Sequence, residues 1–179
     1  MNYRVIDNFA PEEYFTELYD SVMDNSFPWS FQEKVATEED DPDGEQFYFI
    51  HETYHGLTEK SQFHRRLIPM FENIEMKALI RCRVIMYMNQ GKRIIHAPHV
   101  DMGYSHKSGL LYLNTCNGYT RLANNDWKPE DGQGEEVFSE GNKVMSVRNR
   151  LLLHDGSIPH CSTTCTDQRM RILIAFNYF

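Results

Sequence analysis

Two histidines and one aspartate have a spacing that suits a metal centre. His99 and Asp101 flank Val100, so on an extended strand both side chains project from one face, because side-chain direction alternates along a strand. His160 lies far downstream near the end of another expected strand, where a closed sheet brings distant segments together. Two imidazoles and one carboxylate leave three positions of an iron ion open for other ligands. We therefore expect His99, Asp101 and His160 to hold Fe(II).

The composition of the chain indicates its broad class of protein. The chain has 179 residues, of which 41% are hydrophobic, 13% aromatic and 25% charged, as in a single globular domain. The net charge of −8 disfavours nucleic-acid partners, because an acidic surface repels phosphate. The N-terminal segment has no apolar run of signal-peptide type, and no stretch approaches membrane-spanning length, so we expect a cytoplasmic protein with no membrane partner. The four cysteines lack paired CxxC spacing, which predicts reduced thiols.

The first eighty residues predict two helices and one strand. Pro11 and the acids that follow it indicate the start of a helix that runs to about Val22, with apolar residues at three- and four-residue intervals. A strand is expected at Gln46–His51, and a second helix from about Glu59 to Glu75 with Pro69 as a kink or boundary. The core-facing residues expected on this second helix are Phe63, Leu67, Ile68 and Phe71.

From residue 80 onward, short segments rich in β-formers alternate with turn residues, which favours a sandwich or jelly roll with the helices packed outside. Tight turns with positive φ angles are expected at Asn89-Gln90-Gly91, Asn117-Gly118 and Glu140-Gly141-Asn142. The expected strands are Arg81–Met88, Gly109–Leu113, Thr120–Leu122, Lys143–Val147, Arg150–Leu153 and Met170–Phe179.

The order of several motifs resembles a known family. His99-x-Asp101, Tyr112-Leu113-Asn114, His160 and the closing strand from Arg171 to Phe179 together resemble the Fe(II)- and 2-oxoglutarate-dependent oxygenases, in their prolyl-4-hydroxylase-like branch. The resemblance implies a mainly β fold, a double-stranded β-helix (jelly roll, cupin-like) with N-terminal helices against it. It implies one domain over residues 1–179, with a supporting region at 1–79 and a catalytic jelly-roll core at 80–179. Fe(II) and the cosubstrate 2-oxoglutarate would be the cofactors, with O2 as co-reactant and ascorbate as a candidate reductant.

The resemblance also implies which residues bind the cosubstrate. In the family, a basic residue at the start of the last core strand pairs with the far carboxylate of 2-oxoglutarate, and Arg171 and Arg169 both qualify by position. Alignment from the strand end favours Arg171, whereas the variable spacing from the distal histidine keeps Arg169 open. Tyr112 resembles the tyrosine that contacts the same carboxylate, and Tyr87 is expected to line the opposite side of the pocket or to be a core aromatic. Leu173 stands where many members have serine.

The expected activity is hydroxylation of a C–H bond in a peptide, protein or amino acid, with proline among the candidates and succinate and CO2 as coproducts. Two alternatives stay open: a nucleobase demethylase, although Asn177 stands where those enzymes have a second arginine, and a non-catalytic jelly-roll binding module. The sequence predicts neither the oligomeric state nor the substrate. The expected recognition loops are residues 29–44, 51–56, 102–108 and 124–136, with Tyr104, His106 and Trp127 as exposed candidates. His154 is expected either beside the site or on the surface.

Overall fold

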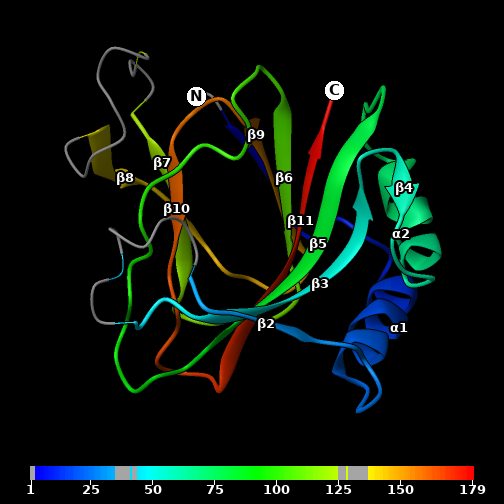
Figure 1. Cartoon of the computed structure of the whole chain (residues 1–179), viewed down its shortest axis with the longest axis horizontal. Helices are drawn as coiled ribbons and strands as arrows, with labels where there is room; N and C mark the ends of the chain where they lie inside the picture. The colour runs from blue at the N-terminus through cyan, green and yellow to red at the C-terminus, as the bar shows by residue number, and fades with distance from the viewer. Residues whose placement is uncertain (1–2, 35–40, 42–43, 125–127, 129–136) are drawn as a thin grey trace.

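Two antiparallel sheets face each other in the computed structural model, which describes residues 3–34, 41, 44–124, 128 and 137–179 (Figure 1). The larger sheet has the order β1 (Tyr3–Ile6), β9 (Arg150–Asp155), β6 (Lys107–Tyr112), β11 (Met170–Tyr178), β5 (Leu79–Met88), β3 (Tyr48–His55) and β2 (Ser30–Gln32), with β4 (Thr58–Glu59) paired to β3. The smaller sheet has the order β10 (His160–Ser162), β7 (Tyr119–Ala123) and β8 (Phe138–Met145). This arrangement confirms the predicted jelly roll.

The strands β5 and β11 lie side by side at the centre of the larger sheet, and their residues alternate between two environments. Cys82 and Val84 of β5, like Ile172 and Ile174 of β11, pack into the hydrophobic core on the outer face. The alternate positions on the two strands, such as Ile85 and Leu173, face the smaller sheet. Because side chains of a strand point alternately to the two faces, one strand serves both the core and the interior of the jelly roll.

The helices cover the outer face of the larger sheet, away from the smaller sheet (Figure 1). Helix α1 (Glu12–Met23) follows Pro11, one residue later than the predicted start, and buries Phe15, Leu18 and Val22 in the core. These side chains recur at three- and four-residue intervals, which places them on one helical face. The periodicity in the sequence therefore predicted both this helix and its buried side.

Helix α2 (His64–Phe71) is much shorter than the predicted helix over residues 59–75. The chain before it turns back on β3, because Gly56 and Leu57 both have positive φ and let Thr58–Glu59 pair with β3 as strand β4. Pro69 lies inside α2. The expected apolar face is also partly wrong, since Met70 is buried whereas Ile68 is 46% exposed.

Three further expectations differ from the structure. Strand β3 runs on to His55, so residues 51–55 are strand and not a recognition loop. Residues 140–142 lie within β8 instead of forming a turn. Gly91 has the expected positive φ, but Asn117 and Gly118 do not. The cysteines are free and buried, and no helix among the described residues is long and apolar enough to cross a membrane.

Candidate metal and cosubstrate site

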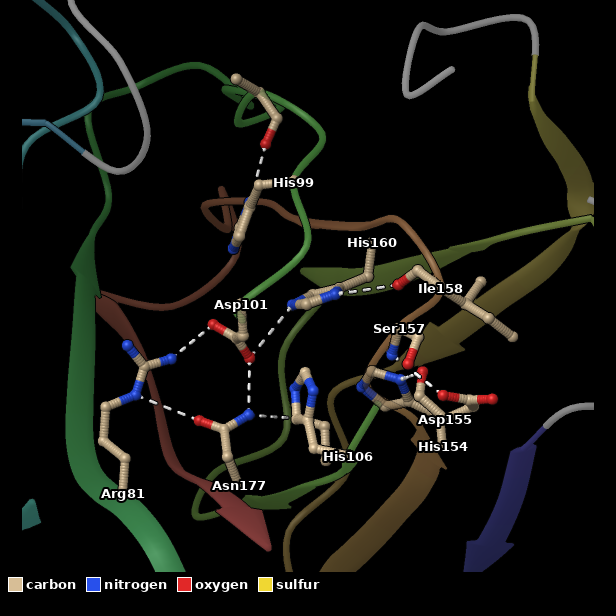
Figure 2. Close-up of polar contacts among 12 residues, drawn as sticks. Arg81, His99, Asp101, His106, His154, Asp155, Ser157, Ile158, His160 and Asn177 are labelled. Carbon is tan, nitrogen blue, oxygen red and sulfur yellow. Dashed lines mark hydrogen bonds and ion pairs between the residues drawn. The ribbon is translucent and has the colours of Figure 1, made fainter. Parts of the chain in front are cut away.

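The two histidines and the aspartate predicted to bind metal converge at one end of the jelly roll (Figure 2). His99 and His160 form a short antiparallel bridge, in which each backbone N donates to the other's carbonyl at 3.0 Å. One ligand atom from each of His99, Asp101 and His160 lies within 4.8 Å of the other two. The backbone bridge therefore holds two residues that are 61 positions apart in sequence in the geometry of a three-ligand site.

Backbone carbonyls orient both imidazoles. His99 Nδ1 lies 3.1 Å from the carbonyl oxygen of Ala97, and His160 Nδ1 lies 3.4 Å from that of Ile158. A carbonyl only accepts hydrogen bonds, so each Nδ1 is the donor, and Nε2 is the nitrogen whose lone pair can bind a metal. Burial, with His99 close by, lowers the pKa of His160 to about 3, so this imidazole is neutral at physiological pH.

Asp101 is held by two side chains from the larger sheet. Arg81 Nη2 donates to Oδ1 at 2.6 Å, and Asn177 Nδ2 donates to Oδ2 at 2.8 Å. Arg81 Nε also donates to Asn177 Oδ1 at 3.1 Å, which closes a cyclic network (Figure 2). Burial opposes ionisation of Asp101, but His160, Arg81 and the Asn177 hydrogen bond together hold its pKa well below the ordinary value. The carboxylate is thus ionised and fixed in orientation.

The other end of the interior holds a fully buried arginine. Arg171, near the start of β11, donates from Nη1 to Ser162 Oγ and to the Thr163 carbonyl, and from Nη2 to Thr120 Oγ1 at 3.0 Å. Tyr112 donates to the same Thr120 oxygen at 2.9 Å. A threonine hydroxyl has two acceptor lone pairs and one proton, so Thr120 is left with its proton to donate to an anion.

Gly118 and Tyr87 complete this cationic end. A Cβ on Gly118 would lie 2.6 Å from Arg171 Cδ, so glycine is required here for close approach and not for its φ angle. Tyr87 is the register partner of Arg171 across β5 and β11. Burial raises the pKa of Tyr87 to about 12, so its phenol stays protonated.

A pocket connects the two ends. His99, Asp101 and His160 line it at one end, and Thr120, Ser162 and Tyr87 line it at the other. Ile85, Leu110, Leu173 and Ala175 form its apolar floor on the larger sheet. The interior therefore has a candidate metal end at His99, Asp101 and His160, an apolar middle, and a polar end backed by the cationic Arg171.

The structure separates the other predicted site residues. Arg169 is exposed just before β11 and does not line this pocket, whereas Arg171 two residues later backs it. Tyr112 is fully buried beside Arg171, with the guanidinium 5.3 Å from its ring centre. His154 packs edge-on against His160 with ring centres 5.1 Å apart. Tyr104 is exposed, His106 is buried, and Trp127 lies outside the described residues.

Sequence reasoning missed four residues that shape the site. The sequence pattern places Arg81 at the start of an expected strand, and Asn177 at the position where nucleobase demethylases have a second arginine. Neither signal predicts that both side chains hold Asp101. Gly118-Tyr119-Thr120 resembles a degenerate Gly-Gly-x-Thr turn of the family, but that motif gives Thr120 no contact with Arg171, and Ser162 belongs to no motif. One available signal was Arg81 itself, because a charged residue on a central strand needs a buried partner.

Comparisons with solved structures identify the fold as that of 2-oxoglutarate- and Fe(II)-dependent oxygenases. A prolyl hydroxylase from Trichoplax adhaerens, solved with a hypoxia inducible factor oxygen degradation domain peptide fragment, aligns over 99% of this chain and 83% of its own, with TM-score 0.67 and 20% identity. The epimerase SnoN from nogalamycin biosynthesis, an α-ketoglutarate-dependent protein, has TM-score 0.67 and 12% identity over 99% of this chain and 78% of its own.

A prolyl-4-hydroxylase from Pseudomonas putida has TM-score 0.60 and 15% identity, with 99% of this chain and 91% of that chain covered. No protein-family model and no curated protein sequence matches this chain. At these identities the likeness shows the fold, which is the double-stranded β-helix shared by prolyl hydroxylases and by an epimerase of different chemistry.

Proposed function

We propose that this chain is an Fe(II)- and 2-oxoglutarate-dependent dioxygenase that hydroxylates a C–H bond of a peptide, protein or amino-acid substrate. The observation that carries the proposal is one pocket with a two-histidine, one-carboxylate site at one end and a buried arginine behind the other. Neutral imidazoles and an ionised carboxylate are the protonation states that bind divalent iron. When bound, iron and 2-oxoglutarate supply the oxidising chemistry, with succinate and CO2 as coproducts.

The chain's own residues would bind and orient these groups. His99, Asp101 and His160 would hold the iron, while Arg81 and Asn177 fix the Asp101 carboxylate. A ligating carboxylate that is itself hydrogen-bonded keeps its orientation when the other metal ligands exchange. The metal-binding residues therefore act on a rigid support.

Arg171 would bind the distal carboxylate of 2-oxoglutarate. It would do so either indirectly, with Thr120 and Ser162 donating to the ligand, or directly, after its hydrogen bonds to those two hydroxyls are replaced by hydrogen bonds to the carboxylate. A planar guanidinium matches a carboxylate well, and charge-assisted hydrogen bonds are the stronger kind. The apolar floor, which includes Leu173 and Ala175, would pack against the methylene groups and exclude water from them. Tyr87 would contribute a neutral phenol at the same end.

An anaerobic titration tests the proposal directly. Addition of Fe(II) and 2-oxoglutarate to the pure protein should give the weak visible charge-transfer band of the chelate, and aerobic incubation should give Fe(II)-dependent succinate. His99→Ala should abolish both. His55→Ala is the matched control, because His55 is half-exposed at the far end of β3, beside Glu52, and should behave as wild type. A protein that binds the metal but shows neither band nor succinate would be a non-catalytic binding module instead.

A further inference from the structure

Arg83 lines the pocket, whereas Arg81 and Arg171 do not, and it takes no part in the metal or cosubstrate binding proposed above. Arg83 lies on β5 two residues after Arg81, so both side chains project from the same face of the strand. It lines the same pocket as His99, Asp101 and His160. The Arg83 guanidinium therefore belongs to the metal end of the interior.

Arg83 differs from its two neighbours in having no partner. Arg81 donates to Asp101 and Asn177, and Arg171 donates to three oxygen atoms. The Nε atom of Arg83 is buried without a hydrogen-bond partner, and no hydrogen bond or ion pair joins Arg83 to any described residue. Its charge nevertheless acts inside the protein, because after burial it is the next cause that lowers the pKa of Arg81.

The neighbouring strand does not neutralise this charge. Glu52 is the register partner of Arg83 on β3, but the Glu52 carboxylate lies 3.1 Å from His55 Nδ1. Arg83 faces Ala175 on its other side, across β11. Arg83 is partly buried, and its buried Nε has no hydrogen-bond partner, which costs free energy that an anionic ligand would offset.

The position of Arg83 indicates which anion this is. Tyr87, at the Arg171 end, is four residues from Arg83, which corresponds to about 13 Å along a strand. The backbone positions of Arg83 and of the Arg171 end are thus well separated along the sheet. A planar guanidinium matches a carboxylate in a bidentate geometry, and the net charge of −8 disfavours polyphosphate ligands.

We propose that Arg83 is a specificity-determining residue that binds a carboxylate of the substrate beside the metal site. This inference rests on the proposed function and narrows the substrate class to molecules with a carboxylate near the reacting C–H bond, such as a free amino acid or the C-terminus of a peptide.

Binding measurements on a catalytically silent complex test the proposal. The probes are N-acetyl-L-proline, N-acetyl-L-leucine and N-acetyl-L-lysine, and each is compared with the corresponding carboxamide, which lacks the negative charge. Calorimetry measures their binding to enzyme loaded with Mn(II) and N-oxalylglycine. Wild type should bind at least one carboxylate about tenfold more tightly than its carboxamide, since a hydrogen bond to a charged group has about that value. Arg83→Gln should remove the preference, and Arg83→Lys should restore part of it.

Arg65→Gln is the matched control, because it removes one positive charge from a side chain that is 73% exposed on α2, and it should keep the preference. Without ligands, Arg83→Gln should melt no lower than wild type, because it removes an unpaired charge. No preference for a carboxylate in wild type, or the same preference in Arg83→Gln, would overturn the inference. A melting temperature of Arg83→Gln far below that of wild type would also overturn it. So would a variant that loses affinity for N-oxalylglycine alone, because Arg83 would then bind the cosubstrate and not the substrate. Failure of Mn(II) and N-oxalylglycine to bind wild type would instead contradict the proposed function.

Discussion

Asn177 offers a sharp test of how the metal end is built. Its Nδ2 donates to Asp101 Oδ2 at 2.8 Å, and its Oδ1 accepts from Arg81 Nε at 3.1 Å. Asn177→Leu keeps the branched shape of the side chain and removes both hydrogen bonds. Outer partners of metal ligands typically contribute about 10- to 100-fold in metal affinity, or about 1.4–2.8 kcal/mol. We therefore expect Asn177→Leu to weaken Mn(II) binding by about 10- to 100-fold.

The assay is the electron paramagnetic resonance signal of free Mn(II), which counts unbound metal directly. Ser108→Ala is the matched control, because Ser108 lies opposite Asn177 in the β6–β11 pairing and its Oγ is 3.4 Å from the same Nδ2. A contact of that length is weak, so the control should stay within about threefold of wild type. An Asn177→Leu protein that folds normally and binds Mn(II) as tightly as the control would refute the reasoning.

A double-mutant cycle extends this test to the network. Arg81→Met removes the Asp101 ion pair and also the partner of Asn177 Oδ1. Because Arg81 and Asn177 bond to each other, their effects on metal affinity should not add. We expect the double variant to lose less affinity than the sum of the two single variants, and strict additivity would show that the two residues act on Asp101 independently.

Three further outcomes follow from packing. Gly118→Ala should displace Arg171 and weaken N-oxalylglycine binding about tenfold in calorimetry, with unchanged Mn(II) affinity, since its Cβ would lie 2.6 Å from Arg171 Cδ. Leu67→Ala, at a fully buried position, should lower the free energy of unfolding by about 2–5 kcal/mol in urea denaturation. Asn149 has φ 59° and bonds to the backbone N and O of Ala10, so Asn149→Ala should cost about 1–3 kcal/mol, whereas an unchanged urea midpoint would contradict this role.

The sequence predicted the parts of this protein whose signals are local. The alternation in β5 and β11 follows from a period of two, and α1 follows from apolar spacing after Pro11. The pairing of His99 with His160 was accessible because ligand chemistry restricts which residues can meet. These features need no knowledge of the tertiary arrangement.

The features it missed depend on contacts across the fold. Arg81 meets Asp101 and Asn177 only because β11 pairs with β5, 96 residues apart at that point. Pairing with β3 takes Glu59 out of the expected second helix, although its local sequence does not oppose a helix. In each case a tertiary contact overrides or adds to the local preference.

The two-sided character of β5 and β11 also limits how these strands can change. A single inserted residue in β5 would turn Arg81 and Arg83 toward Leu67 and its neighbours in the core, and would turn Cys82 and Val84 into the pocket. Turning the arginines is costly, because it buries their charge in the core and removes the hydrogen bond from Arg81 to Asp101. Insertions and deletions should therefore be tolerated only in the connections between strands. Along β5 and β11, the residue types that are tolerated should alternate, with apolar residues at core-facing positions and a different set at pocket-facing positions.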